Sequence, residues 1–436
     1  MEIKKYTNYK DSGIKWLGEI PEHWEIKRIK DAITKIGSGV TPKGGSETYV
    51  DEGIPFIRSQ NVYNDGLKID NVSFITEEVH NRMKNSQLKP LDILINITGA
   101  SIGRTCIFPE SVKTANINQH IIYLRFKKKK VDYPAYYLKS STIQEYIMNI
   151  QAGSSKEALN MSQILNIGLP FPAPEEQTQI ANYLDAKTTG IDKKIKLLKQ
   201  KIKHFKAYRK TLINEAVTRG LVNEVSNWIN YRLKDIGYLY SGLSGKSGND
   251  FNQDNNPNNR GFIPFTNIAN NTYLNQNHLG TVAIKEQENQ NQVKKNDIFF
   301  LMSSEGYEDI GKSAVLIDDI KETYLNSFCK GFRITNNNCE ASFINYLLLS
   351  DSYRQNMLVE GKGFTRINLK MEKVNNFSII IPPTKKEQQE IADYLDVKTT
   401  TIDKIVKNIE TQITTLKELR KTLINEVVTG KIKVTV

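Results

Sequence analysis

An internal repeat constrains the fold of this chain more than any other feature. Sliding the 436-residue sequence by 211 positions superposes residues 175–218 on residues 386–429 without a gap, with 25 identities in 44 positions. The segments before each copy match less well but in the same order, with Trp24 corresponding to Trp228. Because self-similarity at a fixed spacing reports duplicated structural units, we expect two similar halves, each a diverged globular part followed by a nearly invariant tail.

Divergence confined to one part of a duplicated unit indicates that the globular parts recognise different things while the tails perform one task twice. A second anchor between the halves is the tripeptide Ile54-Pro55-Phe56, matched to Ile263-Pro264-Phe265. The predicted division is a first recognition domain, a first spacer helix region, a second recognition domain and a second spacer helix region, at 1–174, 175–223, 224–381 and 382–436.

The tails read as long helices with heptad seams. Pro174 and Pro383 stand where helices begin, and apolar residues then recur at alternating steps of four and three. The seam positions are Ile191, Ile195, Leu198, Ile202, Phe205, Arg209, Leu212 and Ala216, and Ile402, Val406, Ile409, Ile413, Leu416, Arg420, Leu423 and Val427. An approximate dyad between the halves predicts antiparallel helices, about 40 Å long over each seam. The same stripes would also allow two chains to pair.

Charged residues on these helices allow two interpretations. Arg209 and Arg420 lie on the seams; a packed stem with a snorkelling guanidinium is favoured, and a register-fixing or partner-facing charge is the alternative. Between Lys187 and Lys210 there are ten Lys or Arg against one Asp. A solvated face is the favoured explanation of that run, with phosphate contact as the alternative.

The globular parts are predicted to be mixed. Short apolar runs bounded by Gly, Ser and Asn indicate strands at 93–98, 121–126, 298–302 and 313–317. Residues 133–150 and 341–359 favour helices, and 249–259 favours a flexible polar loop. The expected class is α+β: two similar target-recognition domains of mixed β structure with short helices, separated by two long antiparallel coiled-coil helices in an internal pseudo-twofold repeat.

One motif suggests a nucleotide site. Residues 306–313 spell G-x-x-x-x-G-K-S, a phosphate loop, after an apolar strand. Such a loop should be followed by a helix, whereas the residues after Ser313 favour another strand. In the other half of the chain the equivalent stretch, Gly99 to Thr105, has a shorter spacing and carries Arg104 in place of Lys312. We therefore favour a tight turn with a basic tip over a nucleotide-binding loop.

Composition narrows the classes of function. A net charge of +12 favours a polyanionic partner such as double-stranded DNA. The three cysteines form no Cys-x-x-Cys pair, the five histidines are dispersed, and no serine-hydrolase, zinc-protease or dinucleotide motif occurs, so we expect neither catalysis nor a metal site. No long apolar window or signal peptide is present, which predicts a cytoplasmic protein without a membrane partner.

Loops that follow the predicted strands carry side chains suited to DNA. Arg pairs with guanine and Asn or Gln with adenine in the major groove, while Lys binds phosphates. Turn chemistry or solvation is the alternative for each position. The candidate DNA contacts are Lys43, Arg58, Gln60, Asn61, Ser101, Arg104, Asn118, Gln119, Lys156, Thr266, Asn267, Ser304, Lys312, Asn326, Lys330 and Arg366.

Together these residues resemble the specificity subunit of type I restriction-modification systems. The leader Tyr9 to Trp24 is similar to the family's N-terminus, and the borders Leu169 to Gln177 and Ile380 to Gln388 are similar to its junctions between recognition domain and spacer helix. The resemblance spans nearly the whole chain. The second half keeps only Trp228 of the leader and has a less acidic border.

The resemblance implies two domains that each read half of a bipartite DNA site, with the helices setting the gap. It implies no catalytic site or cofactor in this chain; S-adenosylmethionine, ATP and Mg would belong to two modification subunits and to restriction subunits. Docking and spacing would involve the helices through the seam positions above and Gln177, Tyr183, Leu184, Gln388, Tyr394 and Leu395. A nucleotide-binding protein using Gly306 to Ser313 and a pure coiled-coil scaffold are the alternatives.

Overall fold

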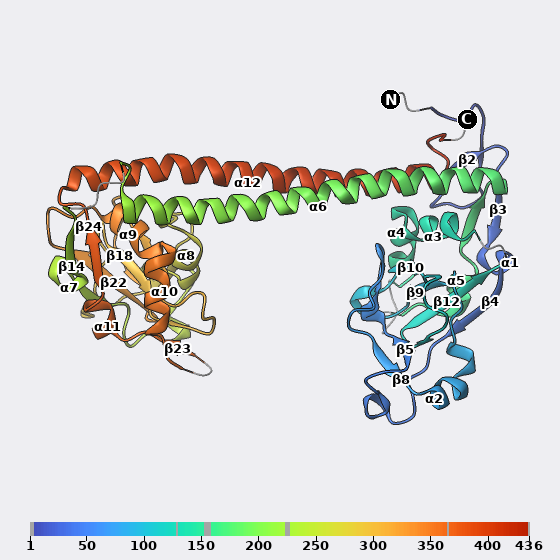
Figure 1. The fold of residues 1–436 in the computed structure, drawn as a ribbon, viewed down its shortest axis with the longest axis horizontal. Coiled ribbons are helices and arrows are strands. Elements are labelled where there is room, and N and C mark those ends of the chain that lie inside the picture. The colour runs from blue at the N-terminus through green and yellow to red at the C-terminus, as the bar shows by residue number, and fades with distance from the viewer. Residues whose placement is uncertain (1–3, 128–129, 152–157, 223–226, 364–365, 435–436) are drawn as a thin grey trace. The chain divides into compact units, whose positions relative to one another are not determined.

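The chain folds into two compact units that share two long helices. The computed structural model describes residues 4–127, 130–151, 158–222, 227–363 and 366–434. Unit 1 comprises residues up to 198 together with those from 411 onward, and unit 2 comprises residues 199–410. The helices α6 (Pro174–Arg219) and α12 (Lys385–Val428) each run from one unit into the other (Figure 1). Within the described residues, no helix is both long and apolar enough to cross a membrane.

The recognition domain of unit 1 contains two small sheets. The four-stranded sheet has the order β10-β9-β12-β4 and the three-stranded sheet the order β11-β5-β8. Pairing is antiparallel except between β11 and β5, which run parallel. The strands are β4 (Ile33–Ser38), β5 (Ile54–Ile57), β8 (Ser73–Ile75), β9 (Ile93–Asn96), β10 (Thr105–Ile107), β11 (Asn116–Ile117) and β12 (Ile121–Phe126).

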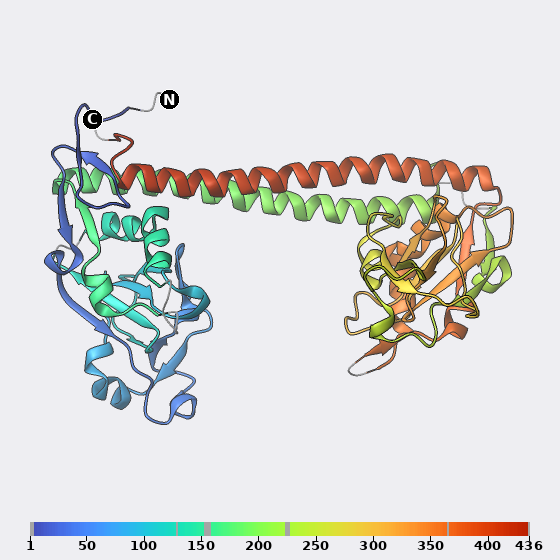
Figure 2. The same cartoon turned by 180° about the vertical axis from the view of Figure 1, so that it is seen from behind.

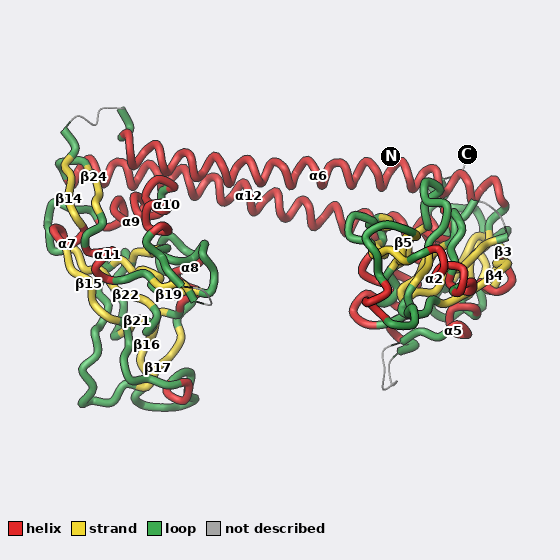
Figure 3. Tube along the Cα trace, turned by 60° about the horizontal axis from the view of Figure 1, so that its bottom comes forward, coloured by secondary structure: helices red, strands yellow, loops and turns green. Residues whose placement is uncertain are grey.

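Unit 2 repeats this topology strand for strand, although its sequence has diverged. Its sheets have the orders β15-β22-β18-β20 and β17-β16-β21, again with one parallel pair, β16 with β21. The three-stranded sheet lies farther from the long helices than the four-stranded sheet does (Figure 3). The strands are β15 (Gly237–Ser241), β16 (Asn259–Ile263), β17 (Gly280–Ala283), β18 (Ile298–Leu301), β20 (Ser313–Val315), β21 (Thr323–Leu325) and β22 (Cys329–Ile334). The predicted α+β class and the duplication are confirmed.

Strand register corrects one anchor of the sequence repeat. Ile117 of β11 pairs with Ile57, whereas the equivalent residue of β21, Leu325, pairs with Ile263. Ile263 therefore corresponds to Ile57 and not to Ile54, so the match between the two Ile-Pro-Phe tripeptides is wrong by three residues. The tripeptides misled because Pro264 belongs to the turn that opens α8 (Phe265–Asn270), while Pro55 lies within β5.

Each predicted domain helix is broken once. Residues 132–150 form α3 (Asp132–Lys139) and α4 (Ser141–Asn149), and their counterparts are α9 (Ala341–Leu349) and α10 (Asp351–Val359). Ser140 and Ser350 break them in the same way: the backbone is extended and the hydroxyl donates to the carbonyl three residues earlier, at 2.7 Å. Serine favours such breaks because its side chain competes for backbone hydrogen bonds. The predicted polar loop at 249–259 includes a short 3-10 turn and ends in β16.

Within each unit, a segment of α6 pairs antiparallel with a segment of α12. Arg420 forms an ion pair with Asp192 at 3.1 Å in unit 1, and Arg209 forms one with Asp403 at 3.3 Å in unit 2. These four residues are two repeat-related pairs, so each half supplies the Asp to one pair and the Arg to the other. Each seam arginine thus lies opposite an aspartate of the other long helix, and in this structure the seams pair within the chain. Other seam residues, such as Ile195 and Ile409, are buried.

The core of each unit includes side chains from both long helices. In unit 1, Trp24 and Tyr137 share a cluster with Leu184 of α6 and with Val427 and Val428 of α12. In unit 2, the equivalent cluster joins α9 to Leu212 and Val217 of α6 and to Ile391 and Leu395 of α12. Helices α3 and α4, like α9 and α10, lie beside the long helices (Figure 1). Burial of apolar surface contributes about 25 cal/mol per Å² to the free energy of unfolding, so the packing of the long helices into both cores is a large stabilising contribution.

Both described ends of the chain meet in unit 1. The Lys433 N–H donates to the Lys4 carbonyl at 2.8 Å, and the Tyr9 hydroxyl donates to the Gly430 carbonyl at 3.2 Å (Figure 2). The leader that precedes Trp24 is therefore held by the last turn of α12 and the residues after it.

A buried ion pair occurs in both units, as Arg125 with Asp92 and as Arg333 with Asp297. Arg125 contacts Asp92 at 2.6 Å, and the Asp92 side chain is only 1% exposed. Arg125→Met should lower the free energy of unfolding by about 3 kcal/mol, because it leaves a buried carboxylate without its cation. Chemical denaturation of the full chain measures this. The control Arg28→Met removes an exposed pair with Asp31 and should change it by less than about 1 kcal/mol; equal effects would contradict the argument.

Candidate nucleic-acid interface

Parallel strand pairing brings two loops together in each unit. Because β5 and β11 run in the same direction, the loops at their carboxyl ends, 58–61 and 118–120, leave the sheet at one edge. The Asn118 N–H donates to the Ile57 carbonyl at 3.0 Å, and the equivalent Asn326 N–H donates to Ile263 at 3.2 Å. Sequence positions about 60 residues apart are thus neighbours in both recognition domains.

A third loop, which follows β9 or β18, joins the other two. In unit 1 the Asn96 amide donates to the Ser59 carbonyl at 2.8 Å, and the Thr98 hydroxyl lies 2.6 Å from His120 Nδ1. In unit 2 the Met302 N–H donates to the Phe328 carbonyl at 3.2 Å. Each unit therefore presents one cluster of three loops, which contains most of the predicted DNA contacts.

Two predicted base contacts are wrong because their side chains are used inside the cluster. Asn61 is buried; its amide donates to the Lys68 carbonyl at 2.9 Å and its oxygen accepts the Arg58 N–H. The equivalent Asn267 is fully buried, donates to the carbonyls of Asn275 and His278, and accepts the Asn275 N–H. Both side chains hold the loop after the first parallel strand, and Asn267 donates both of its amide hydrogens within the protein.

Three further candidates also hold loops. The side-chain oxygens of Asn118 and Asn326 accept the N–H two residues later, at 3.3 and 2.9 Å, as in Asx turns. Ser304 is buried and its hydroxyl accepts the Gly306 N–H at 3.1 Å, so it too holds its loop.

Next to these asparagines, which occupy equivalent positions in the two units, stand residues that differ between the units and are exposed except for half-buried His120. Gln60 corresponds to Thr266, Gln119 to Ser327, and His120 to Phe328. The Gln119 amide contacts the Thr41 hydroxyl and His120 Nε2, so its orientation is held. Phe328 is 46% exposed, and the Arg366 guanidinium lies over its ring at 4.7 Å. Phe328 was not singled out from the sequence as a base contact; its place two residues after Asn326, equivalent to that of His120 after Asn118, is the signal that identifies it.

The other predicted DNA contacts in unit 1 are cations and a small hydroxyl residue. Arg58 lies over the Tyr49 ring at 5.8 Å and Arg104 over the Tyr63 ring at 5.0 Å, while Lys43 is exposed. The Ser101 hydroxyl accepts the Asn96 amide at 3.0 Å. Lys156 lies outside the described residues.

In unit 2, Lys330 donates to the Ser241 hydroxyl at 3.0 Å, and exposed Thr266 lies 3.1 Å from His278. A hollow of about 340 Å³ separates the loops, lined by Phe265, Ser303, Ser304, Glu305, Gly306, Asp309, Phe328 and Arg366. An arginine stacked on an exposed aromatic ring at its rim offers both a hydrogen-bonding fork and an apolar face.

The G-x-x-x-x-G-K-S segment does not form a nucleotide-binding loop. Ser313 begins strand β20 instead of a helix, so the N-terminal amides that would hold a phosphate are missing from this segment. Lys312 contacts Asp309 at 2.7 Å. In the described part of the chain, no group of three or more His, Cys, Asp or Glu could hold a metal ion.

Several residues assigned to subunit docking are instead internal. Gln177 and Gln388 are buried and donate to the carbonyls of Pro172 and Pro382, at 2.8 and 2.9 Å. Leu184 and Leu395 belong to the unit cores. These four side chains therefore stabilise the junctions between the long helices and the unit cores, which agrees with a spacer role, and docking of partner subunits through them stays a prediction. Half-buried Tyr183 and Tyr394 remain at the surface, with Lys187 and Lys398 over their rings at 5.6 and 5.5 Å.

Comparison with known proteins agrees with this architecture. The type I restriction modification DNA specificity domain matches residues 21–204 and 225–415. The chain belongs to this family, whose name assigns it to DNA specificity rather than to catalysis. It is 25% identical to the MjaIX specificity subunit of Methanocaldococcus jannaschii, over 98% of this chain and 97% of that protein, and 23% identical to the EcoKI specificity subunit of Escherichia coli, over 95% and 90%.

Two solved structures share the fold. The HsdS subunit of Thermoanaerobacter tengcongensis matches with a TM-score of 0.57 at 15% identity, over 97% of this chain and 100% of that one. A chain from a structure of type I restriction-modification complex assembly matches with a TM-score of 0.74 at 14% identity, over 94% and 98%.

The second prediction separates residues that hold the loops from residues exposed on them. Asn267→Ala should lower the free energy of unfolding by about 2 kcal/mol, because it strands buried backbone groups of Asn275 and His278. Thr266→Ala, one residue earlier and exposed, should change it by less than about 0.5 kcal/mol. Thermal or urea denaturation of the two variants distinguishes them, and similar losses would mean that Asn267 does not hold the loop.

Proposed function

We propose that this chain reads a bipartite DNA target, one half with each unit, as the specificity subunit of a type I restriction-modification complex. The three-loop cluster of each unit enters the major groove, and the long helices set the gap between the two half-sites. The observation that carries this proposal is the duplicated cluster itself, in which equivalent asparagines hold the same loops while the exposed positions beside them differ.

The difference at those positions supports two different half-sites. Gln60 presents an exposed amide, which pairs with adenine through its N6 and N7 atoms. Phe328 presents an apolar edge that fits a thymine methyl group, and the Arg366 fork suits guanine. We therefore propose an adenine in the half-site of unit 1 and a thymine or guanine in that of unit 2.

The partners follow from the same proposal. Two modification subunits dock on the outer faces of the helices and use S-adenosylmethionine, and restriction subunits bind ATP and Mg in a cytoplasmic complex. Support for two equivalent docking places comes from the repeat: a half-buried tyrosine with an exposed lysine over its ring occurs once on each helix, as Tyr183 with Lys187 and as Tyr394 with Lys398.

The third prediction exchanges the exposed set between the units. Gln60→Thr, Gln119→Ser and His120→Phe, introduced together, give unit 1 the residues of unit 2. The first two positions are exposed, and the third change also removes the hydrogen bond between His120 and Thr98. Co-expression with the cognate modification subunit, followed by single-molecule mapping of N6-methyladenine, should show one altered half-site, with the other half-site and the gap unchanged.

The matched control is Gln163→Thr, which changes a glutamine of α5 (Met161–Leu165) in the same unit but outside the loop cluster, and should leave both half-sites intact. A change in both half-sites with the triple variant would refute the assignment of one half-site to each unit. An unmethylated genome with the unaltered chain, despite a stable complex, would count against the specificity function itself.

A further inference from the structure

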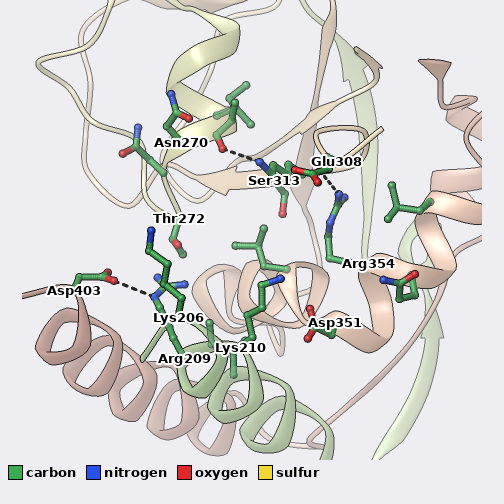
Figure 4. Close-up of a pocket in the computed structure, with 18 residues that line it drawn as sticks. Lys206, Arg209, Lys210, Asn270, Thr272, Glu308, Ser313, Asp351, Arg354 and Asp403 are labelled. Carbon is green, nitrogen blue, oxygen red and sulfur yellow. Dashed lines mark hydrogen bonds and ion pairs between the residues drawn. The ribbon is translucent and has the colours of Figure 1, made fainter. Parts of the chain in front are cut away.

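A basic hollow lies within unit 2, between α6 and the recognition domain, and none of the functions above uses it. Its volume is about 830 Å³. Figure 4 shows Lys206 and Lys210 reaching into it from α6 and Arg354 from α10. The cations that line it are Lys206, Arg209, Lys210, Lys312 and Arg354. The carboxylates are those of Glu308, Asp351 and Asp403.

Two of the five cations are neutralised by a close carboxylate. Arg209 pairs with Asp403 at 3.3 Å and Lys312 with Asp309 at 2.7 Å. Of the ion pairs found among the described residues, none includes Lys206 or Lys210. These two lysines belong to the stretch of α6 with ten Lys or Arg and one Asp, and so the surrounding helix adds positive potential.

The guanidinium of Arg354 is held in place but keeps its charge available. It donates to the carbonyls of Ile310 and Glu308, the latter at 2.9 Å. Burial lowers the pKa of Arg354, yet arginine stays protonated at neutral pH. Carbonyl partners fix its position without cancelling its charge, so it offers a pre-ordered cation at the wall opposite α6.

A buried hydroxyl on the wall of the hollow has no partner within the described protein. The Ser313 side chain is 1% exposed, lines the hollow, and its oxygen forms no hydrogen bond with any described residue. Buried polar groups in folded proteins are nearly always hydrogen-bonded. A hydroxyl donor on the wall of a hollow that is lined by cations is matched by an anion with several acceptor oxygens.

We propose that this hollow binds a phosphate group between Lys206, Lys210, Arg354 and the Ser313 hydroxyl. Phosphate fits because its oxygens accept several hydrogen bonds at once and its charge is balanced by the lysines. The site is not the loop that the G-x-x-x-x-G-K-S spelling suggests, since Lys312 is paired with Asp309 and the anchoring cations come from α6 and α10.

Its position favours a phosphate of the DNA backbone, and that choice of source rests on the proposed function. Residues 303–312 line both hollows of unit 2: Ser304 and Gly306 border the one with Phe328 and Arg366, and Glu308 and Lys312 border the basic one. One loop thus carries a base-reading surface on one side and a phosphate site on the other. Phosphate contacts position a protein on DNA without reading the base sequence.

The test compares variants of the full chain that remove the same charge from repeat-related positions. Lys206→Gln with Lys210→Gln empties the hollow of its free lysines, and Lys417→Gln with Lys421→Gln changes the equivalent exposed lysines of α12. Fluorescence anisotropy with duplex DNA over a range of salt gives the slope of log affinity against log salt. The first variant should reduce the slope by about 1, as expected for one lost phosphate contact, and the second should leave it unchanged.

A third variant, Ser313→Ala, isolates the hydroxyl. Because the buried hydroxyl has no partner among the described residues, its loss should not lower the melting temperature, whereas it should weaken phosphate binding about tenfold. Titration calorimetry with pyrophosphate, on the unaltered chain and on Ser313→Ala, measures the same site without DNA.

The outcomes distinguish a phosphate of the DNA backbone from a free phosphate compound as the ligand of the hollow. A reduced salt slope without pyrophosphate binding assigns the hollow to the DNA backbone, and pyrophosphate binding that Ser313→Ala weakens, with an unchanged slope, assigns it to a free phosphate compound. If the unaltered chain binds no DNA, the DNA arm fails with the proposed function while pyrophosphate still decides the site. Equal slopes for both lysine variants together with no pyrophosphate binding would overturn the phosphate site.

Discussion

The structure depends on the packing of each long helix into two different cores. The first turns of α6 complete unit 1 and its last turns complete unit 2, while α12 does the reverse. Neither recognition domain can therefore bury its apolar surface with its own residues alone. The reciprocal pairs Arg420–Asp192 and Arg209–Asp403 add little energy at their exposed positions, but they define how the seams align. The recognition surfaces of the two units can differ in sequence because both units are built on the same pair of long helices.

The helices and the duplication were predictable because they depend on local periodicity. The seam from Ile191 to Ala216 has a strict 3.5-residue period, and no tertiary contact is needed to recognise it. The strand register was harder to predict from the sequence. Two identical Ile-Pro-Phe tripeptides gave a false anchor, since a proline within a strand and a proline in a turn look alike in sequence. Only the parallel pairing of β11 with β5 and of β21 with β16 identifies Ile57 as the equivalent of Ile263.

The candidate site shows why residue type alone is a poor guide to DNA contact. Asparagine suits both a base edge and a tight loop, and the buried side chains of Asn61 and Asn267 hold their loops through hydrogen bonds to the backbone. Whether an asparagine is exposed, and which residue of the other unit it corresponds to, distinguishes a base contact from a loop-holding residue. Both facts come from the structure and not from the sequence. The basic run of α6 was visible in the sequence, but the hollow formed with Arg354 and Ser313 was not, since those residues lie more than 100 positions away in the chain.

The sharing of helices between the units also sets the order in which they can be completed during synthesis. Unit 2 is one continuous stretch, residues 199–410, whereas unit 1 needs the residues from 411 onward to close its core and to hold Lys4 against Lys433. At about 5–20 residues per second, a ribosome that has made residue 198 needs roughly 10–40 s to reach residue 411. The recognition domain that emerges first is thus the last to be finished, and during that interval its surface around Trp24 and Leu184 lacks its cover from α12.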